Sequence, residues 1–414
     1  MNAKLREALP VLVRLAEAGH KAYFVGGCVR DVLLGRPPGD VDIATSARPE
    51  AVMALFPHHV PTGLKHGTVT VFLDGRTYEV TTFRTESGYE DYRRPSDVAF
   101  VEDIETDLSR RDFTVNAMAM DAEGRIVDPF GGREDLARGL IRCVGHPEER
   151  FREDALRMVR AIRFAADLGF RVAPSAWRAL RRNAVLLRHI ALERIGAELD
   201  KMIRGPDPDR AVALFLRSGL WRETKTPLDA PDGPACAVMP RLSDLEAGDL
   251  RWIALLAASN VPPEAACRWM AGFAFGKKRL HRIFAPLDLH AAAKDAPDTR
   301  EAWAELALAH GREAASDWLG VMQACPAIRP VPAEALERRA AWLADMPAFS
   351  AAELALDGST LVKAAGRKSG PWIRRTMDRL LRETAAGRLP NERTALLGRA
   401  LDILNDEPDG RDAG

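Results

Sequence analysis

Two carboxylates spaced two residues apart follow a pair of glycines near the start of this chain. The glycines, Gly26 and Gly27, come directly after an apolar stretch at 22–25, and the carboxylates are Asp40 and Asp42. Glycines at that position let the backbone approach a bulky anion, because no Cβ blocks it. Side chains two apart on a strand share one face, so we expect both aspartates to point the same way. Paired carboxylates beside a phosphate-binding turn are typical of a divalent metal held between protein and nucleotide phosphates.

Two further charged side chains belong to this candidate site. Arg30 lies in the helix expected after the glycines. The N-terminal amides of such a helix favour phosphate, and the charge of Arg30 would add to that attraction. Glu79 lies in a strand-like stretch at 77–83, where it shares a face with Thr81 and Phe83. Glu79 is a candidate third carboxylate beside the aspartate pair. The alternative is a solvent-facing charge on a half-exposed strand.

The order and spacing of these residues resemble the nucleotidyltransferase superfamily. The form Gly-Gly-x-Val-Arg-Asp, followed by Asp-x-Asp-Ile-Ala-Thr, is similar to its class II branch, the tRNA CCA-adding enzymes and bacterial poly(A) polymerases. Residues 110–117 resemble the second motif of that branch. An arginine such as Arg111 can fork onto phosphate, and the resemblance implies that Asp112 holds the ribose. Arg111, Asp112 and Asn116 are therefore predicted to bind nucleotide, together with Gly27 and Arg30.

The stretch at 153–164 resembles the fourth motif, Glu-Asp-x-x-Arg, which in the family serves as a template for C and A. We expect one helix here, on which Asp154 and Arg157 are neighbours three residues apart. They would offer one acceptor and several donors to a base edge, and the alternative is an ordinary intrahelical ion pair. Arg160 and Arg163 continue the same helix and are also predicted to bind nucleotide.

A polar stretch at 84–107 shows little periodicity, and loops of this length inside compact domains tend to be functional or disordered. The family resemblance implies a mobile loop here that is associated with addition of the final A.

Near the C-terminus, residues 356–394 resemble the RNA-binding segment of many CCA-adding enzymes. Helical spacing there aligns Arg375, Arg379 and Arg382 as a basic stripe, which we predict to bind tRNA. A solvated helix face is the alternative interpretation.

The bulk composition constrains the partners and the compartment. Basic and acidic residues balance at 59 each, so no global positive field indicates nucleic acid. The charge is uneven, because 150–194 holds eleven arginines against four acidic residues. The five cysteines show no metal-ligand or disulfide spacing, which is typical of reduced, intracellular thiols. No apolar stretch reaches the roughly 18 residues of a membrane span, so we expect a cytoplasmic protein that contacts no membrane.

The periodicity changes near residue 140, from mixed to helical. The sequence therefore predicts an α+β fold, with a small mixed-sheet nucleotidyltransferase head followed by an elongated all-α neck, body and tail. Strands are expected at 22–25, 40–44, 68–73 and 77–83, helices at 1–18 and 49–56, and a hairpin turn at Asp74-Gly75. The domains expected are a head at 1–140, a base-recognising neck at 141–205, a body at 206–330 and a tRNA-binding tail at 331–414.

Together these patterns predict an RNA nucleotidyltransferase that works without a nucleic-acid template. The resemblance implies that it adds C, C and A to the tRNA 3′ end from CTP and ATP, with Mg²⁺ held by Asp40 and Asp42 and pyrophosphate released. The C-terminal segment favours this over a poly(A) polymerase, and the stretch at 84–107 argues against an enzyme that adds only CC. An enzyme that adds only A stays an alternative. The sequence leaves open a monomer or a homodimer.

Overall fold

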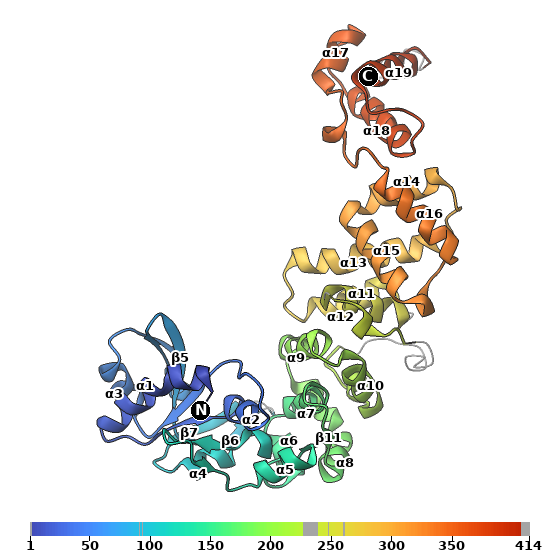
Figure 1. The fold of residues 1–414 in the computed structure, drawn as a ribbon. Coiled ribbons are helices and arrows are strands. Elements are labelled where there is room, and N and C mark those ends of the chain that lie inside the picture. Colours follow the sequence, from blue (N-terminus) through green and yellow to red (C-terminus); the bar gives the residue numbers. More distant parts are fainter. Residues whose placement is uncertain are drawn as a thin grey trace. The chain divides into compact units, whose positions relative to one another are not determined.

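The computed structural model describes residues 2–90, 92, 94–226, 239–246, 248–259 and 261–406. It divides into two compact units, Met1–Leu228 and Asp229–Gly414. All the strands described belong to the first unit (Figure 1). The predicted α+β class is thereby confirmed.

One mixed sheet of seven strands forms the centre of the head, in the order β3-β4-β5-β2-β1-β8-β9. Its strands are β1 (Ala22–Val25), β2 (Asp42–Thr45), β3 (His59–Gly63), β4 (Thr68–Leu73), β5 (Arg76–Thr82), β8 (Ala119–Met120) and β9 (Ile126–Val127). Strands β2 and β5 run parallel, and their register places Asp42 opposite Glu79. The turn between β4 and β5 has positive φ at Asp74 (50°) and Gly75 (74°), which is the predicted hairpin.

Three helices of the head match the sequence pattern closely. They are α1 (Ala3–Glu17), α2 (Gly27–Leu33) and α3 (Pro49–Leu55). Helix α1 buries one apolar face through Leu5, Ala8, Val11, Leu12 and Leu15, at the spacing expected for an amphipathic helix. Proline at the start of α3 has the fixed φ that a first helical turn requires.

The strand expected at 40–44 begins only at Asp42, so the prediction that both aspartates lie on one strand was wrong. Asp40 lies in the bend before β2. The preceding residues, Pro37 and Pro38, lack the N–H that a strand would need for pairing. The carbonyls of Pro38 and Gly39 accept hydrogen bonds from the Lys4 ammonium of α1, at 2.9 and 3.1 Å.

The polar stretch at 84–107 is also more regular than predicted. It forms an antiparallel pair, β6 (Arg84–Glu90) and β7 (Arg94–Phe100), followed by α4 (Ile104–Ser109). Alternating apolar residues do not reveal this hairpin, because charged side chains stabilise its base. Arg84 pairs there with Glu86 at 2.8 Å.

Helices dominate the rest of the first unit. They are α5 (Gly132–Arg138), α6 (Pro147–Glu153), α7 (Leu156–Asp167), α8 (Pro174–Arg182), α9 (Leu192–Arg204) and α10 (Pro208–Ser218). Two short strands, β10 (Leu140–Ile141) and β11 (Arg171–Val172), pair in parallel among them. A buried stripe runs along α6, the residue just before α7, and α7 itself: Phe151, Ala155, Val159, Ile162 and Ala166.

The single helix expected through 153–164 is broken into α6 and α7. Asp154 lies between them with extended φ and ψ of −139° and 104°, and its carboxylate accepts from the amide of Leu156 at 3.1 Å. Asp is a residue that favours such a helix start, because its short side chain satisfies an otherwise unpaired amide. We refer to Asp154 and Ala155 as the α6–α7 break.

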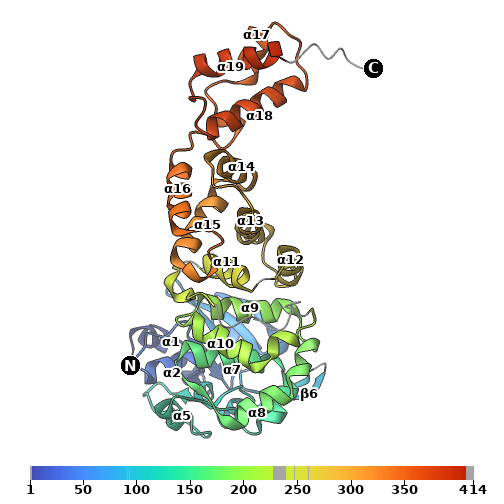
Figure 2. The ribbon, with the colours of Figure 1, turned by 90° about the vertical axis from the view of Figure 1, so that its right-hand side faces the viewer.

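Among the residues that the structure describes, the regular secondary structure of the second unit is all helical (Figure 2). Its helices are α11 (Gly248–Ala258), α12 (Pro263–Ala271), α13 (Lys277–Ala293), α14 (Arg300–His310), α15 (Arg312–Ala324), α16 (Ala333–Ala344), α17 (Gly358–Ala365), α18 (Trp372–Ala385) and α19 (Arg393–Asp406). The last three share an apolar core that includes Leu361, Leu380 and Leu396. No helix built from the described residues has both the length and the apolarity needed to cross a membrane.

Four of the five cysteines lie in described positions, and all four are free thiols: Cys28, Cys143, Cys267 and Cys325. The fifth, Cys236, lies outside the described residues. Burial raises the pKa of the Cys28 thiol to about 11, so this residue of the glycine turn is protonated at neutral pH.

Candidate active site

The turn between β1 and α2 brings backbone and guanidinium close together. Gly26 has a φ of +73°, and a Cβ built on it would lie 2.9 Å from Nη1 of Arg111. A side chain here would be strained by its backbone and would also displace Arg111. Gly26 therefore allows Arg111 to reach the turn, next to Gly27 at the start of α2.

The predicted carboxylates gather around two interior strands of the sheet, β2 and β5. Asp42 and Glu79 are partners in the parallel β2–β5 register, and Asp40 stands two residues before β2 pairing is established. Burial raises the pKa of Asp42, and the charges of Glu79 and Asp40 act in the same direction against that of Arg111. Across the described residues, none of the three carboxylates takes part in a hydrogen bond or an ion pair. The site thus concentrates negative charge with little compensation.

This donor set fits a divalent cation that also takes oxygens from its substrate. Within the part of the chain that the structure describes, no three His, Cys, Asp or Glu side chains are arranged to hold a metal by themselves. Mg²⁺ is commonly bound by one or two carboxylates together with substrate phosphates, rather than by a cage made only of protein. Asp40 and Asp42 fit that mode of binding.

A cleft of about 550 Å³ joins these carboxylates to side chains of α7 and α9. We call it the arginine cleft. Eleven predicted residues line it: Gly27, Arg30, Asp40, Asp42, Arg111, Asp112, Asn116, Asp154, Arg157, Arg160 and Arg163. Glu79 does not line it. Gly26, the other glycine of the predicted phosphate-binding turn, lines it too. Sequence reasoning missed four others in the lining: Glu86, Arg110, Phe164 and Lys201.

Asp112 is held firmly at the floor of this cleft. One carboxylate oxygen accepts from Nε and Nη2 of Arg160, at 2.9 and 2.8 Å. The other accepts from the amide of Phe113 and from Nδ2 of Asn116, at 2.8 and 3.2 Å. Burial alone would raise the pKa of Asp112, but the charge of Arg160 lowers it below its ordinary value. Asp112 is therefore ionised, and its orientation is fixed by Arg160 of α7.

Three arginines of the cleft surround the ring of Phe164. The guanidinium carbons of Arg30, Arg160 and Arg163 lie 5.4, 5.1 and 4.0 Å from its centroid. Arg163 also pairs with Glu198 of α9 at 2.6 Å. The attraction between cations and the ring face gathers like charges that would otherwise repel one another. The sequence places Phe164 only on a helix, because nothing in its spacing separates it from ordinary core residues.

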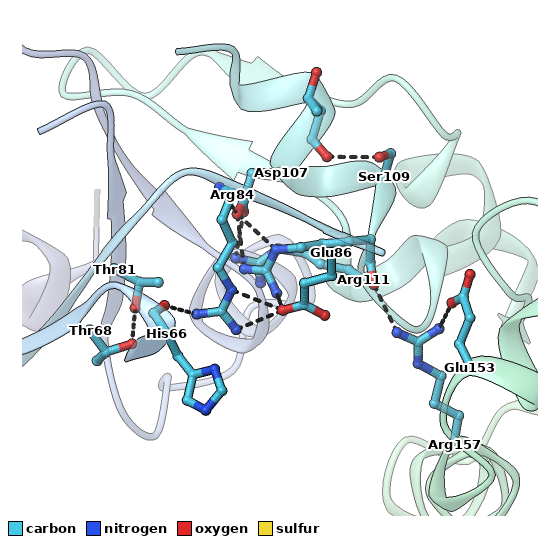
Figure 3. Close-up of polar contacts among 12 residues, drawn as sticks. His66, Thr68, Thr81, Arg84, Glu86, Asp107, Ser109, Arg111, Glu153 and Arg157 are labelled. Carbon is cyan, nitrogen blue, oxygen red and sulfur yellow. Dashed lines mark hydrogen bonds and ion pairs between the residues drawn. The ribbon is translucent and has the colours of Figure 1, made fainter. Parts of the chain in front are cut away.

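Asp154 and Arg157 line the same cleft but do not form the predicted intrahelical pair. Asp154 instead pairs with Arg194 of α9 at 2.9 Å. Arg157 pairs with Glu153 at 2.6 Å and donates to the carbonyl of Arg110 at 3.0 Å (Figure 3). The α6–α7 break turns Asp154 away from the helical position that the spacing had suggested.

Charged groups connect the β6–β7 hairpin to the cleft, as Figure 3 shows. Asp107 is 1 % exposed and pairs with Arg110 at 2.9 Å and Arg111 at 3.3 Å. It also accepts from the amide of Arg84 at 3.2 Å. Burial would raise the pKa of Asp107, yet the two arginines lower it. Asp107 thus ties the start of the hairpin to Arg111.

The basic stripe predicted in the tail lies on one helix, α18. Arg375, Arg379 and Arg382 are all exposed there, while Met377 and Leu380 are buried. Nε of Arg379 lies 3.4 Å from Glu383, one turn later. The stripe is therefore accessible to a ligand from solvent.

Three family models match the chain. Residues 22–142 match the poly A polymerase head domain, 169–224 match the probable RNA and SrmB-binding site of polymerase A, and 244–400 match the putative tRNA nucleotidyltransferase domain 2. The first match covers the sheet and its carboxylates. The second begins just after α7 has ended.

Named relatives match over nearly the whole length. The CCA-adding enzyme of Geobacillus stearothermophilus is 43% identical over 395 residues, which cover 95% of this chain and 96% of that protein. The crystal structure of the Bacillus stearothermophilus CCA-adding enzyme in complex with CTP has a TM-score of 0.82 and 39% identity, and covers 98% of this chain and 99% of that one.

A more distant structure shares the fold. The Thermotoga maritima CCA-adding enzyme complexed with tRNA has a TM-score of 0.64 at 20% identity, with 98% and 96% of the two chains covered. Nucleotidyltransferases of this kind generally use divalent metal ions. On the strength of its near-complete match to named relatives, this chain belongs to the family of CCA-adding enzymes.

Proposed function

We propose that this protein adds C, C and A in turn to the 3′ end of tRNA, using CTP and ATP and releasing pyrophosphate. The observation that supports this best is the arginine cleft, in which a carboxylate pair, a glycine turn and the α6–α7 break meet. Carboxylates for a metal, cations for a triphosphate and a polar pair for a base are the parts that nucleotidyl transfer needs.

Asp40 and Asp42 are the groups that would hold Mg²⁺, with Glu79 as a further carboxylate beside Asp42. Bound there, the metal would lower the pKa of the primer 3′-hydroxyl and neutralise charge on the α-phosphate. The gathering of three carboxylates that make no ion pair with a described residue supports this assignment. Their side chains would provide the oxygens that hold the ion.

The cations of the cleft would bind the triphosphate. Arg30 and Arg111 lie beside the glycine turn, and Arg160 and Arg163 face them from α7. The guanidinium fork suits phosphate oxygens, and its charge would stabilise the pyrophosphate as it leaves. Little covalent chemistry falls to the protein, so positioning and charge stabilisation would supply most of the rate.

Asp154 and Arg157 would select the base. The Watson–Crick edges of cytosine and adenine each offer an amine donor next to a ring-nitrogen acceptor. One carboxylate and one guanidinium can meet either edge, whereas uracil and guanine place a carbonyl where Asp154 needs a donor. A polar group left unpaired in this way costs about 1–3 kcal/mol. Asp112 would hold the ribose and so favour ribonucleotides.

We further propose a division of labour along the chain. Residues 1–140 would carry the chemistry, 141–205 would recognise the base, and 206–330 and 331–414 would form a body and a tRNA-binding tail. The exposed stripe of Arg375, Arg379 and Arg382 on α18 supports a role in binding RNA phosphates. Work on tRNA would place the protein in the cytoplasm.

The test uses tRNA that lacks its last three nucleotides, with Mg²⁺ and CTP or ATP, singly and together. The proposal predicts two additions with CTP alone, three with both nucleotides, and then no further extension. A long A tail made from ATP alone would contradict it in favour of a poly(A) polymerase. Products that stop after CC with both nucleotides present would show that the protein adds only CC.

A further inference from the structure

The backbone segment that carries Asp40 has few contacts that fix its position. Asp40 is exposed and lies in the bend before β2, outside any strand pairing. Pro37 and Pro38 have no N–H to donate. Among the residues that the structure describes, the only hydrogen bonds to the backbone of residues 37–40 come from the ammonium of Lys4. The position of Asp40 therefore depends on a side chain from outside the sheet.

Lys4 reaches this segment from the first turn of α1. Its ammonium donates to the carbonyls of Pro38 and Gly39 at 2.9 and 3.1 Å. Its own amide donates to the side chain of Asn2, the cap of that helix, at 3.0 Å. A charged donor forms stronger hydrogen bonds than a neutral one. Lys4 thus fastens the two residues before Asp40 to the start of a helix.

Helix α1 is a firm support for this contact. Leu5 and Leu12 are no more than 1% exposed, so its apolar face is packed against the head. The carbonyl of Glu7 accepts from the hydroxyl of Tyr78 in β5 at 3.2 Å. Strand β5 pairs in turn with β2, which begins at Asp42. Through α1, Lys4 therefore connects the bend to the strands beside it.

We propose that Lys4 is a positioning residue for the carboxylate pair, because it fixes where Asp40 stands relative to Asp42. This rests on the proposed nucleotidyl transfer, in which the two aspartates hold Mg²⁺, and adds a residue of α1 that lies outside the sequence motifs. Mg²⁺ demands nearly ideal octahedral geometry from its oxygen ligands. The apparent affinity for the metal therefore scales with the fraction of molecules in which the bend is correctly placed.

The charge of Lys4 acts against this role and gives the test a sign. Lys4 and Arg76 line one cleft of about 580 Å³ together with both aspartates. A cation there repels a metal ion, so on charge alone its removal should tighten metal binding. Arg76 instead pairs with Glu7 at 2.9 Å and, in the described part of the chain, makes no hydrogen bond to residues 37–40. Only a positioning role predicts that loss of Lys4 weakens metal binding.

The test measures the binding of Mn²⁺ to the metal-free full-length protein, followed by the electron paramagnetic resonance of the free ion. Lys4→Met should raise the Kd for Mn²⁺ by roughly three- to tenfold, if the released bend holds Asp40 in place for about a tenth to a third of the time. Lys4→Arg keeps a charged donor for the carbonyls and should lie closer to the wild type. Arg76→Gln, the control for charge, should leave the Kd unchanged or lower it.

Two further measurements separate positioning from a general effect on the fold. Tyr78→Phe removes a hydrogen bond between α1 and β5 but none to the bend. It should lower Tm and leave the Kd for Mn²⁺ unchanged. In catalysis, Lys4→Met should raise the half-saturating Mg²⁺ concentration by the same factor as the Kd. Its kcat at saturating Mg²⁺ and its KM for tRNA should stay near those of the wild type.

The assignment fails if Lys4→Met binds Mn²⁺ no more weakly than Arg76→Gln does, or if Tyr78→Phe weakens binding as much as Lys4→Met. A wild-type protein that binds no Mn²⁺ would overturn both this assignment and the metal site on which it rests. Failure of the wild-type protein to extend tRNA is a different result, because it overturns the proposed function and leaves the Mn²⁺ affinities to be compared. Circular dichroism identifies a variant that has misfolded, and Lys4→Arg then carries the comparison.

Discussion

The carboxylate of Asp154 is held on two sides by the guanidinium of Arg194, with Nη2–Oδ2 at 2.9 Å and Nη1–Oδ1 at 3.3 Å. This fork fixes the plane of a carboxylate that lies in the α6–α7 break and has no helix to orient it. Arg194 itself does not line the arginine cleft. It is therefore a positioning residue for Asp154.

Arg194→Ala should loosen base selection without removing any cleft residue. We expect kcat/KM for CTP and ATP to fall, and their advantage over UTP and GTP to shrink about tenfold, as loss of one well-oriented hydrogen bond implies. Arg194→Lys should restore little, because an ammonium cannot form the fork. Arg152→Ala, which removes an exposed arginine of α6, should leave selection intact. Unchanged preference in Arg194→Ala would contradict the positioning role.

Asp42 is predicted to lower the stability of the folded protein, although the proposed activity needs its carboxylate. Its pKa is raised in the folded state by burial, so the ionised form costs stability above the unfolded value of about 3.9. Asp42→Asn should therefore abolish nucleotide incorporation and raise Tm at pH 7 in metal-free buffer. The gain should disappear as the pH falls below that unfolded value. A lower Tm at pH 7 would mean that Asp42 stabilises the fold.

Asp112 should show the opposite dependence. Its pKa is lowered in the folded state by Arg160, so its contribution is present above the unfolded value of about 3.9 and is lost as the pH falls through the folded pKa. Asp112→Asn should destabilise the head by about 1–3 kcal/mol at pH 7, since buried hydrogen-bonding partners lose their charge complement. Glu134→Gln, in an exposed pair with Arg138, should cost under about 1 kcal/mol. Denaturant unfolding at pH 7 and pH 3 measures the change in the free energy of unfolding for both variants.

The β6–β7 hairpin should matter for the last addition. The carbonyl of Tyr92 accepts from the amide of Ala155 at 3.1 Å, and its ring lies 5.0 Å from that of His189. The hairpin tip therefore contacts the α6–α7 break. Replacing residues 88–96 by an Asn-Gly turn should leave C addition intact and stop products at CC. A shortened protein that completes CCA at the normal rate would remove the hairpin from the mechanism.

Much of the head follows from local chemistry in the sequence. The glycine turn needs glycine at Gly26, and the Asp-Gly hairpin needs positive φ. The residue types at these positions therefore predict the local backbone conformation. Asp40 shows the limit of this reasoning. Its spacing from Asp42 suggests one strand, but Lys4 holds the preceding carbonyls, and a contact between segments so far apart in the sequence leaves no local pattern.

The α6–α7 break is a second feature that the local sequence pattern does not predict. Asp154 and Arg157 have helical spacing, and the sequence around them is amphipathic across the break, so periodicity predicted one helix. The break depends on the backbone geometry at Asp154 and on its fork with Arg194, 40 residues later in the chain. Phe164 was missed for a related reason. Its surrounding cations come from two helices, α2 and α7, and only the fold brings them together.

The most direct measurement compares incorporation and tRNA binding in Asp40→Ala and Asp42→Ala. The account predicts that either variant loses addition of both C and A, because one carboxylate pair serves every step, while its affinity for tRNA stays near that of the wild type. Single-turnover rates with CTP and ATP, beside a binding titration, give both quantities. A variant that keeps more than about a tenth of the wild-type rate, which corresponds to less than about 1.4 kcal/mol of lost transition-state stabilisation, would contradict it.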